Sequence, residues 1–93
     1  MSAQNEFRKA IKYLDFGKDE KGEQCLRDAI NLAKSEGDKG TLIEASCCYG
    51  DYLCSIGKTN EAKPYLELVL SLESASEPFQ YEFKRAQELL TGC

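Results

Sequence analysis

The 93-residue sequence contains no histidine, no tryptophan and only two prolines. Without histidine, the chain cannot form a catalytic pair or a metal site that depends on imidazole. No run approaches the roughly 18 apolar residues of a transmembrane helix. The N-terminal segment MSAQNEFRKAIKYLDF lacks the apolar core of a signal peptide. We therefore expect a cytoplasmic protein.

Glycine-rich phosphate loops and C-x-x-C pairs are also absent, although the chain has five cysteines. Cys47 and Cys54 are seven residues apart on one expected helix, which separates them by about 10 Å, too far to share one metal ion. The adjacent Cys47 and Cys48 point to different faces. We expect reduced, mostly buried thiols, with no metal, no cofactor and no enzymatic activity.

The composition is that of one small globular domain, with 42% apolar and 30% charged residues. The 16 acidic and 12 basic residues give a net charge of −4. This balance argues against nucleic acid as the main partner, because phosphate contacts need clustered Lys and Arg. It allows a protein partner with a basic or amphipathic surface. Solubility alone would also explain a mildly acidic surface.

Apolar residues recur at the spacing of one helical face, and no segment alternates at period two. Phe7, Ala10, Ile11 and Leu14 predict a helix over residues 3–16. Similar patterns predict helices over residues 20–36, 41–56, 60–73 and 77–91. The expected boundary signals are N-caps at Ser2, Asp19 and Ser76, a capping box of Thr41 with Glu44, Pro78 in the last helix's first turn, and left-handed glycines at 17, 37 and 57. The predicted fold is all-α.

The sequence repeats at an offset of 40 residues. AIKYLDFGKDEKGEQCLRDAINLA (10–33) aligns with GDYLCSIGKTNEAKPYLELVLSLE (50–73). Gly17 aligns with Gly57, and Leu26 with Leu66. Each unit reads as an apolar helix, a glycine, a short charged turn and a second apolar helix, so the chain predicts two helical hairpins and a final helix.

This pattern resembles the tetratricopeptide repeat over residues 3–73. In the second unit, Tyr49 and Gly50 replace the Leu-Gly pair of that repeat, and the other matching positions are Leu53, Ala62 and Leu66. The sequence departs from the family at Ser46, where tryptophan is usual, and at Ser74, where proline is usual. In the first unit, Glu6 and Lys9 hold two normally apolar positions. The resemblance implies one domain with hairpins at 3–36 and 41–73 and a capping helix at 77–91, a short α-solenoid.

In tetratricopeptide proteins, the first helix of each hairpin lines a concave, ligand-binding groove. Carried over, this places the following candidate partner-binding residues on the inner face: Phe7, Ile11, Leu14, Glu44, Cys47, Asp51 and Cys54. The alternatives are core packing for the three apolar residues, helix capping for Glu44 and a solvated carboxylate for Asp51. Tetratricopeptide domains that bind a chaperone's C-terminal carboxylate use Lys, Asn and Arg in this groove. The corresponding positions here hold Phe7, Ile11, Cys47 and Asp51.

The leading functional interpretation is a non-enzymatic module that binds another protein. A concrete version is a stoichiometric inhibitor, such as an immunity protein that covers a basic toxin domain. The alternative is an adaptor or a self-associating scaffold subunit, including a homodimer. The last helix separates these alternatives. If Phe79, Phe83 and Leu90 pack against the fourth helix, the apolar end is closed and a monomer is expected.

Overall fold

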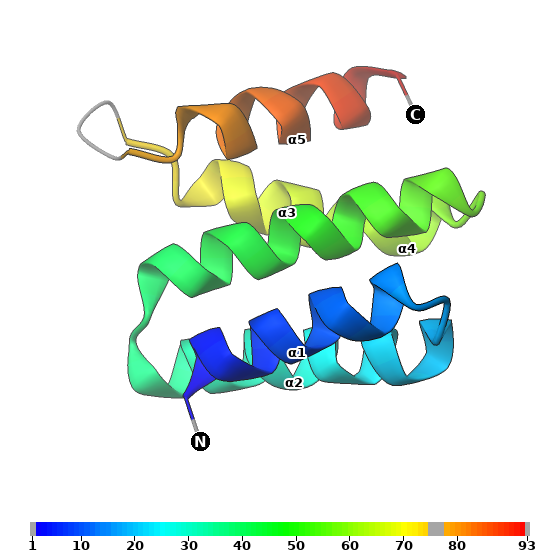
Figure 1. The fold of residues 1–93 in the computed structure, drawn as a ribbon. Coiled ribbons are helices and arrows are strands. Elements are labelled where there is room, and N and C mark those ends of the chain that lie inside the picture. Colours follow the sequence, from blue (N-terminus) through cyan, green and yellow to red (C-terminus); the bar gives the residue numbers. More distant parts are fainter. Residues whose placement is uncertain (1, 75–77, 93) are drawn as a thin grey trace. The chain divides into compact units, whose positions relative to one another are not determined.

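In a computed structural model of the chain, residues 2–74 and 78–92 are described. These residues form five α-helices and no β-strand (Figure 1), which confirms the predicted all-α fold. The helices are α1 (Ala3–Asp15), α2 (Asp19–Glu36), α3 (Lys39–Ser55), α4 (Thr59–Ser71) and α5 (Gln80–Gly92). Among these helices, none combines the length and the apolarity needed to cross a lipid bilayer.

The chain divides into two compact units, with the boundary inside α3. The N-terminal unit (Met1–Ala45) contains the hairpin of α1 and α2 and the start of α3. The C-terminal unit (Ser46–Cys93) contains the rest of α3, with α4 and α5. Within it, α5 packs against α4.

The start of α1 is as predicted, but the start of α2 is not. The Ser2 hydroxyl accepts a hydrogen bond from the Asn5 amide at 3.1 Å, which is the expected N-cap. The prediction of an Asp19 cap is wrong, because α2 begins at Asp19 and Lys18 takes the N-cap position without a side-chain bond. A carboxylate in the first turn still interacts favourably with the helix dipole.

The capping box predicted at Thr41 and Glu44 is also wrong. Helix α3 begins at Lys39, and the Asp38 carbonyl accepts the hydrogen bond of the Leu42 amide. The Asp38 carboxylate accepts bonds from the Thr41 amide at 3.1 Å and the Thr41 hydroxyl at 2.7 Å. Asp38 therefore caps the helix, because its carboxylate accepts from the first-turn amide of Thr41, which has no partner within the helix.

Helix α5 begins later than the sequence suggests. It starts at Gln80, and the Phe79 carbonyl accepts the first hydrogen bond from the Phe83 amide at 3.1 Å. Pro78 therefore precedes the helix instead of lying in its first turn. The predicted cap at Ser76 lies outside the described residues.

The two hairpins have the same turn geometry. Gly17 and Gly57 have φ values of 75° and 81°, so both are left-handed as predicted. Each glycine amide donates at 3.1 Å to the carbonyl three residues earlier, and each following lysine amide donates at 2.8 Å to the carbonyl five residues earlier. This pair of bonds is the Schellman ending of a helix. The bonds of the two turns differ in residue number by 40, so the sequence repeat is also a repeat of local structure.

Equivalent positions of the two hairpins are also buried alike. The small or apolar pairs that share burial are Ala10 with Gly50, Gly22 with Ala62, Leu26 with Leu66, and Ala29 with Val69. A Cβ atom added at Gly22 would lie 2.7 Å from Leu14, and one added at Gly50 would lie 2.5 Å from Leu66. Both glycines therefore permit the close approach of the two helices in their hairpin.

Ser46, at the usual tryptophan position, is fully buried, and its hydroxyl oxygen has no hydrogen-bond partner. We expect Ser46→Ala to stabilise the protein by roughly 1 kcal/mol, because it removes an unsatisfied polar group and improves helix propensity. The midpoint of urea unfolding measures the change. Ser55→Ala is the control, since that hydroxyl is exposed and donates to the Tyr52 carbonyl. A lower midpoint for Ser46→Ala would contradict this account.

Candidate functional site

The candidate residues divide between the two units. Phe7, Ile11, Leu14 and Glu44 belong to the N-terminal unit, and the other three, Cys47, Asp51 and Cys54, belong to the C-terminal unit. Phe7, Ile11 and Leu14 are each half-buried. The Leu14 side chain lies 2.7 Å from the position that a Cβ atom on Gly22 would take, so it packs inside its own hairpin. For Leu14, this contact favours the core-packing alternative.

Glu44 is half-buried and has an interaction of its own. Because α3 begins five residues earlier, at Lys39, Glu44 lies beyond the first turn and does not serve as a helix cap. Its capping alternative is therefore wrong.

The two polar residues at normally apolar positions of α1 form an ion pair. The carboxylate of Glu6, which is only 4% exposed, accepts from the Lys9 ammonium at 3.1 Å. The hydrogen bond and the charge of Glu6 raise the pKa of Lys9. An ion pair one turn apart on the same helix explains how this unit tolerates a buried acid at that position.

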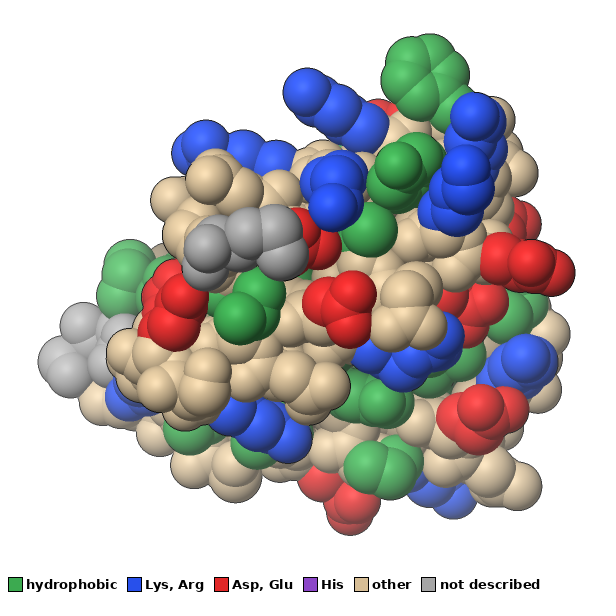
Figure 2. All heavy atoms as spheres, turned by 90° about the horizontal axis from the view of Figure 1, so that it is seen from below, with side chains coloured by type: hydrophobic (Ala, Val, Ile, Leu, Met, Phe, Trp, Pro, Cys, Tyr) green, Lys and Arg blue, Asp and Glu red, His purple; other side chains and the backbone are tan. Residues whose placement is uncertain are grey.

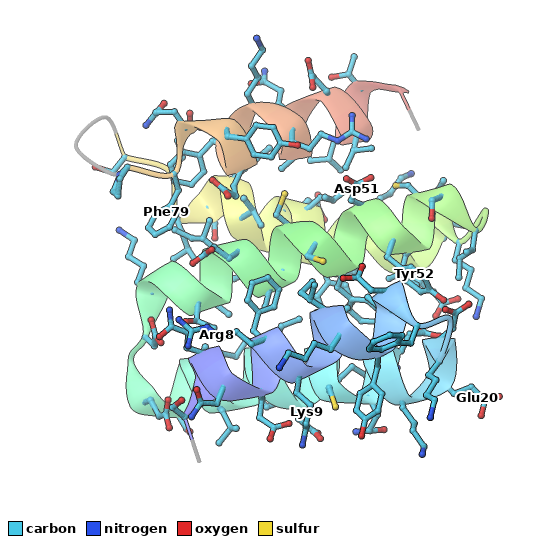
Figure 3. The ribbon with its side chains drawn as sticks, viewed as in Figure 1. Arg8, Lys9, Glu20, Asp51, Tyr52 and Phe79 are labelled. Atoms are coloured by element: carbon cyan, nitrogen blue, oxygen red, sulfur yellow. The ribbon has the colours of Figure 1, made fainter. Side chains whose placement is uncertain are left out.

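Asp51 binds an arginine of α5. Its two carboxylate oxygens accept hydrogen bonds from Arg85 Nη2 at 3.1 Å and Arg85 Nε at 3.2 Å. Figure 3 shows Asp51 on the stretch of α3 beside α5. The hydrogen bond to Asp51 raises the pKa of Arg85. Sequence reasoning missed Arg85, although the inward register of Phe83 and Ala86 predicts that residue 85 flanks the α5 contact face.

Cys47 is also covered by α5. It is 5% exposed, and its thiol donates a long hydrogen bond of 3.7 Å to the Glu82 carbonyl. Burial, reinforced by the charges of Glu82 and Asp51, raises the pKa of Cys47 to about 12. Burial likewise raises the pKa of Cys48 to about 11. Cys54 is half-buried and has its own interaction. The described residues contain no group of three or more potential metal ligands placed to hold an ion.

The last helix closes its end of the C-terminal unit. Phe83 and Ala86 of α5 are buried, as are Leu66 and Val69 of α4, and the two helices pack together. Phe79, Leu70 and Leu90 are half-buried. The packing of α5 on α4 covers this end of the unit, and with a covered end we expect a monomer.

Among residues 2–74 and 78–92, three large apolar side chains are exposed. Phe16 is 79% exposed, Ile56 is 44% exposed and Tyr81 is 72% exposed. Phe16 and Ile56 are equivalent in the 40-residue repeat, and each directly precedes the left-handed glycine that ends a helix. Both hairpins therefore present an apolar side chain at the same point of the turn.

The surface offers shallow hollows and mixed charge. Three hollows are each lined by a single helix or turn, for example Asp28, Asn31, Leu32 and Ser35 of α2. These open hollows differ from the enclosed clefts that bury most of a small ligand's surface. On the face shown in Figure 2, Lys and Arg side chains are interspersed with Asp, Glu and scattered apolar residues.

The ion pair of Asp51 and Arg85 is expected to contribute to the stability of the fold. We expect Asp51→Lys to lower the melting temperature by a few degrees, because it places two cations together. Arg85→Glu, added to Asp51→Lys, should restore most of the loss by reversing the pair. Thermal unfolding followed by circular dichroism measures both. Glu67→Lys is the charge-matched control, because Glu67 is exposed on α4.

This pair also changes how groove binding must be tested. A partner that binds Asp51→Lys less well could be responding to a displaced α5. The restored double variant separates a loss of folding from a loss of contact. If the double variant melts no higher than Asp51→Lys alone, the two residues are not coupled.

No known protein family, no curated protein and no solved structure matches this chain.

Proposed function

We propose that this chain is a non-enzymatic, cytoplasmic protein–protein interaction module of the tetratricopeptide type. The observation that supports the proposal is the repeated hairpin, with matching Schellman turns at Gly17 and Gly57 and matching buried small residues. Repeats of this kind are used to build extended surfaces that hold other proteins.

The distribution of charge favours a basic or amphipathic partner. Residues 46–93 contain seven acidic and four basic residues, so this half has most of the net negative charge. On α4, Glu61 and Glu67 are exposed. An acidic surface speeds the encounter with a basic protein. The concrete version that we favour is a stoichiometric inhibitor, such as an immunity protein that covers a basic toxin domain.

The second candidate is an adaptor or self-associating scaffold. Phe16 and Ile56 favour it, because equivalent exposed apolar side chains at both hairpin turns offer two repeated points of contact. Single exposed apolar residues are common on monomers. They therefore support the scaffold less strongly than the structural repeat supports the interaction module.

Affinity capture from the native cells tests the proposal. The tagged chain is purified under reducing conditions, and its partners are identified and quantified by mass spectrometry. One small basic protein at equal stoichiometry supports the inhibitor version. A large assembly or copies of the chain itself support the scaffold. Recovery of the chain as a free monomer, with no enriched protein, would contradict both forms.

A further inference from the structure

We draw no further inference here: the strongest candidate, the exposed surface patch along α1 and its C-terminal end where Arg8, Lys12 and Phe16 follow one another at successive turns, carries no proposal, because nothing in the part of the chain that the structure describes shows what covers it.

Discussion

Gly50→Val is expected to destabilise the protein by about 3 kcal/mol, at the upper end of the range for overpacking a core. A Cβ atom at Gly50 would lie 2.5 Å from Leu66 Cδ2 and 2.8 Å from Leu66 Cγ. Leu66 is fully buried, so its side chain has no solvent to move into. The loss exceeds the few tenths of a kcal/mol that valine gains over glycine in helix propensity. The free energy of urea unfolding measures the effect.

A second substitution at Leu66 should partly relieve the clash, and valine at Gly92 serves as the control. Leu66→Ala alone should cost roughly 2–5 kcal/mol, because it leaves a cavity. The double variant Gly50→Val/Leu66→Ala should be more stable than the sum of the two losses predicts, since the valine fills part of that cavity. At Gly92, where an added Cβ atom meets nothing within 4 Å, valine should change stability by less than about 0.5 kcal/mol. Additive losses in the double variant would show that the two residues are not in contact.

The sequence predicted the helices well because helical periodicity and glycine stops are local signals. The alignment of the two repeats alone identifies Gly17 and Gly57 as left-handed helix ends, and their φ values and hydrogen bonds agree with this prediction. The N-cap of α3 was missed because Asp38 and Thr41 are both good cap residues. Only the structure shows that Thr41 donates to Asp38. Choices between neighbouring caps depend on a residue or two of helix register, which periodicity does not resolve.

The candidate site was less predictable because it depends on contacts between residues distant in sequence. The residues of α3 were named from their place in the repeat, whereas Arg85 is 34 residues away from its partner Asp51. Amphipathic patterning indicates which face of α5 is buried, but it does not give the helix against which that face packs. The covering of Cys47 by α5 follows from this packing, so it could not be read from α3 alone.

Cys47 is expected to resist alkylation at about pH 8 in the folded chain. A pKa of about 12, against an ordinary value of 9.0, leaves roughly a thousandfold less thiolate than in the unfolded chain. Burial under α5 lowers the reaction rate further. Iodoacetamide labelling followed by peptide mass spectrometry measures the rate at each cysteine, and the same chain in urea gives the reference. Labelling of Cys47 at the unfolded rate would show that α5 does not cover it.

The same thiols make stability depend on alkaline pH. Because the folded chain holds the protons of Cys47 and Cys48 more tightly than the unfolded chain does, the stability linked to them is complete below about pH 9. That stability is lost as the pH rises toward 11 for Cys48 and toward 12 for Cys47. At about pH 10.5, the loss from Cys47 alone should reach about 2 kcal/mol. Cys47→Ala removes this titrating group while keeping a small apolar side chain, so its urea midpoint should fall less between about pH 8 and 10.5. If the urea midpoint falls equally with pH in the wild-type chain and in Cys47→Ala, the Cys47 thiol is not buried in its neutral form.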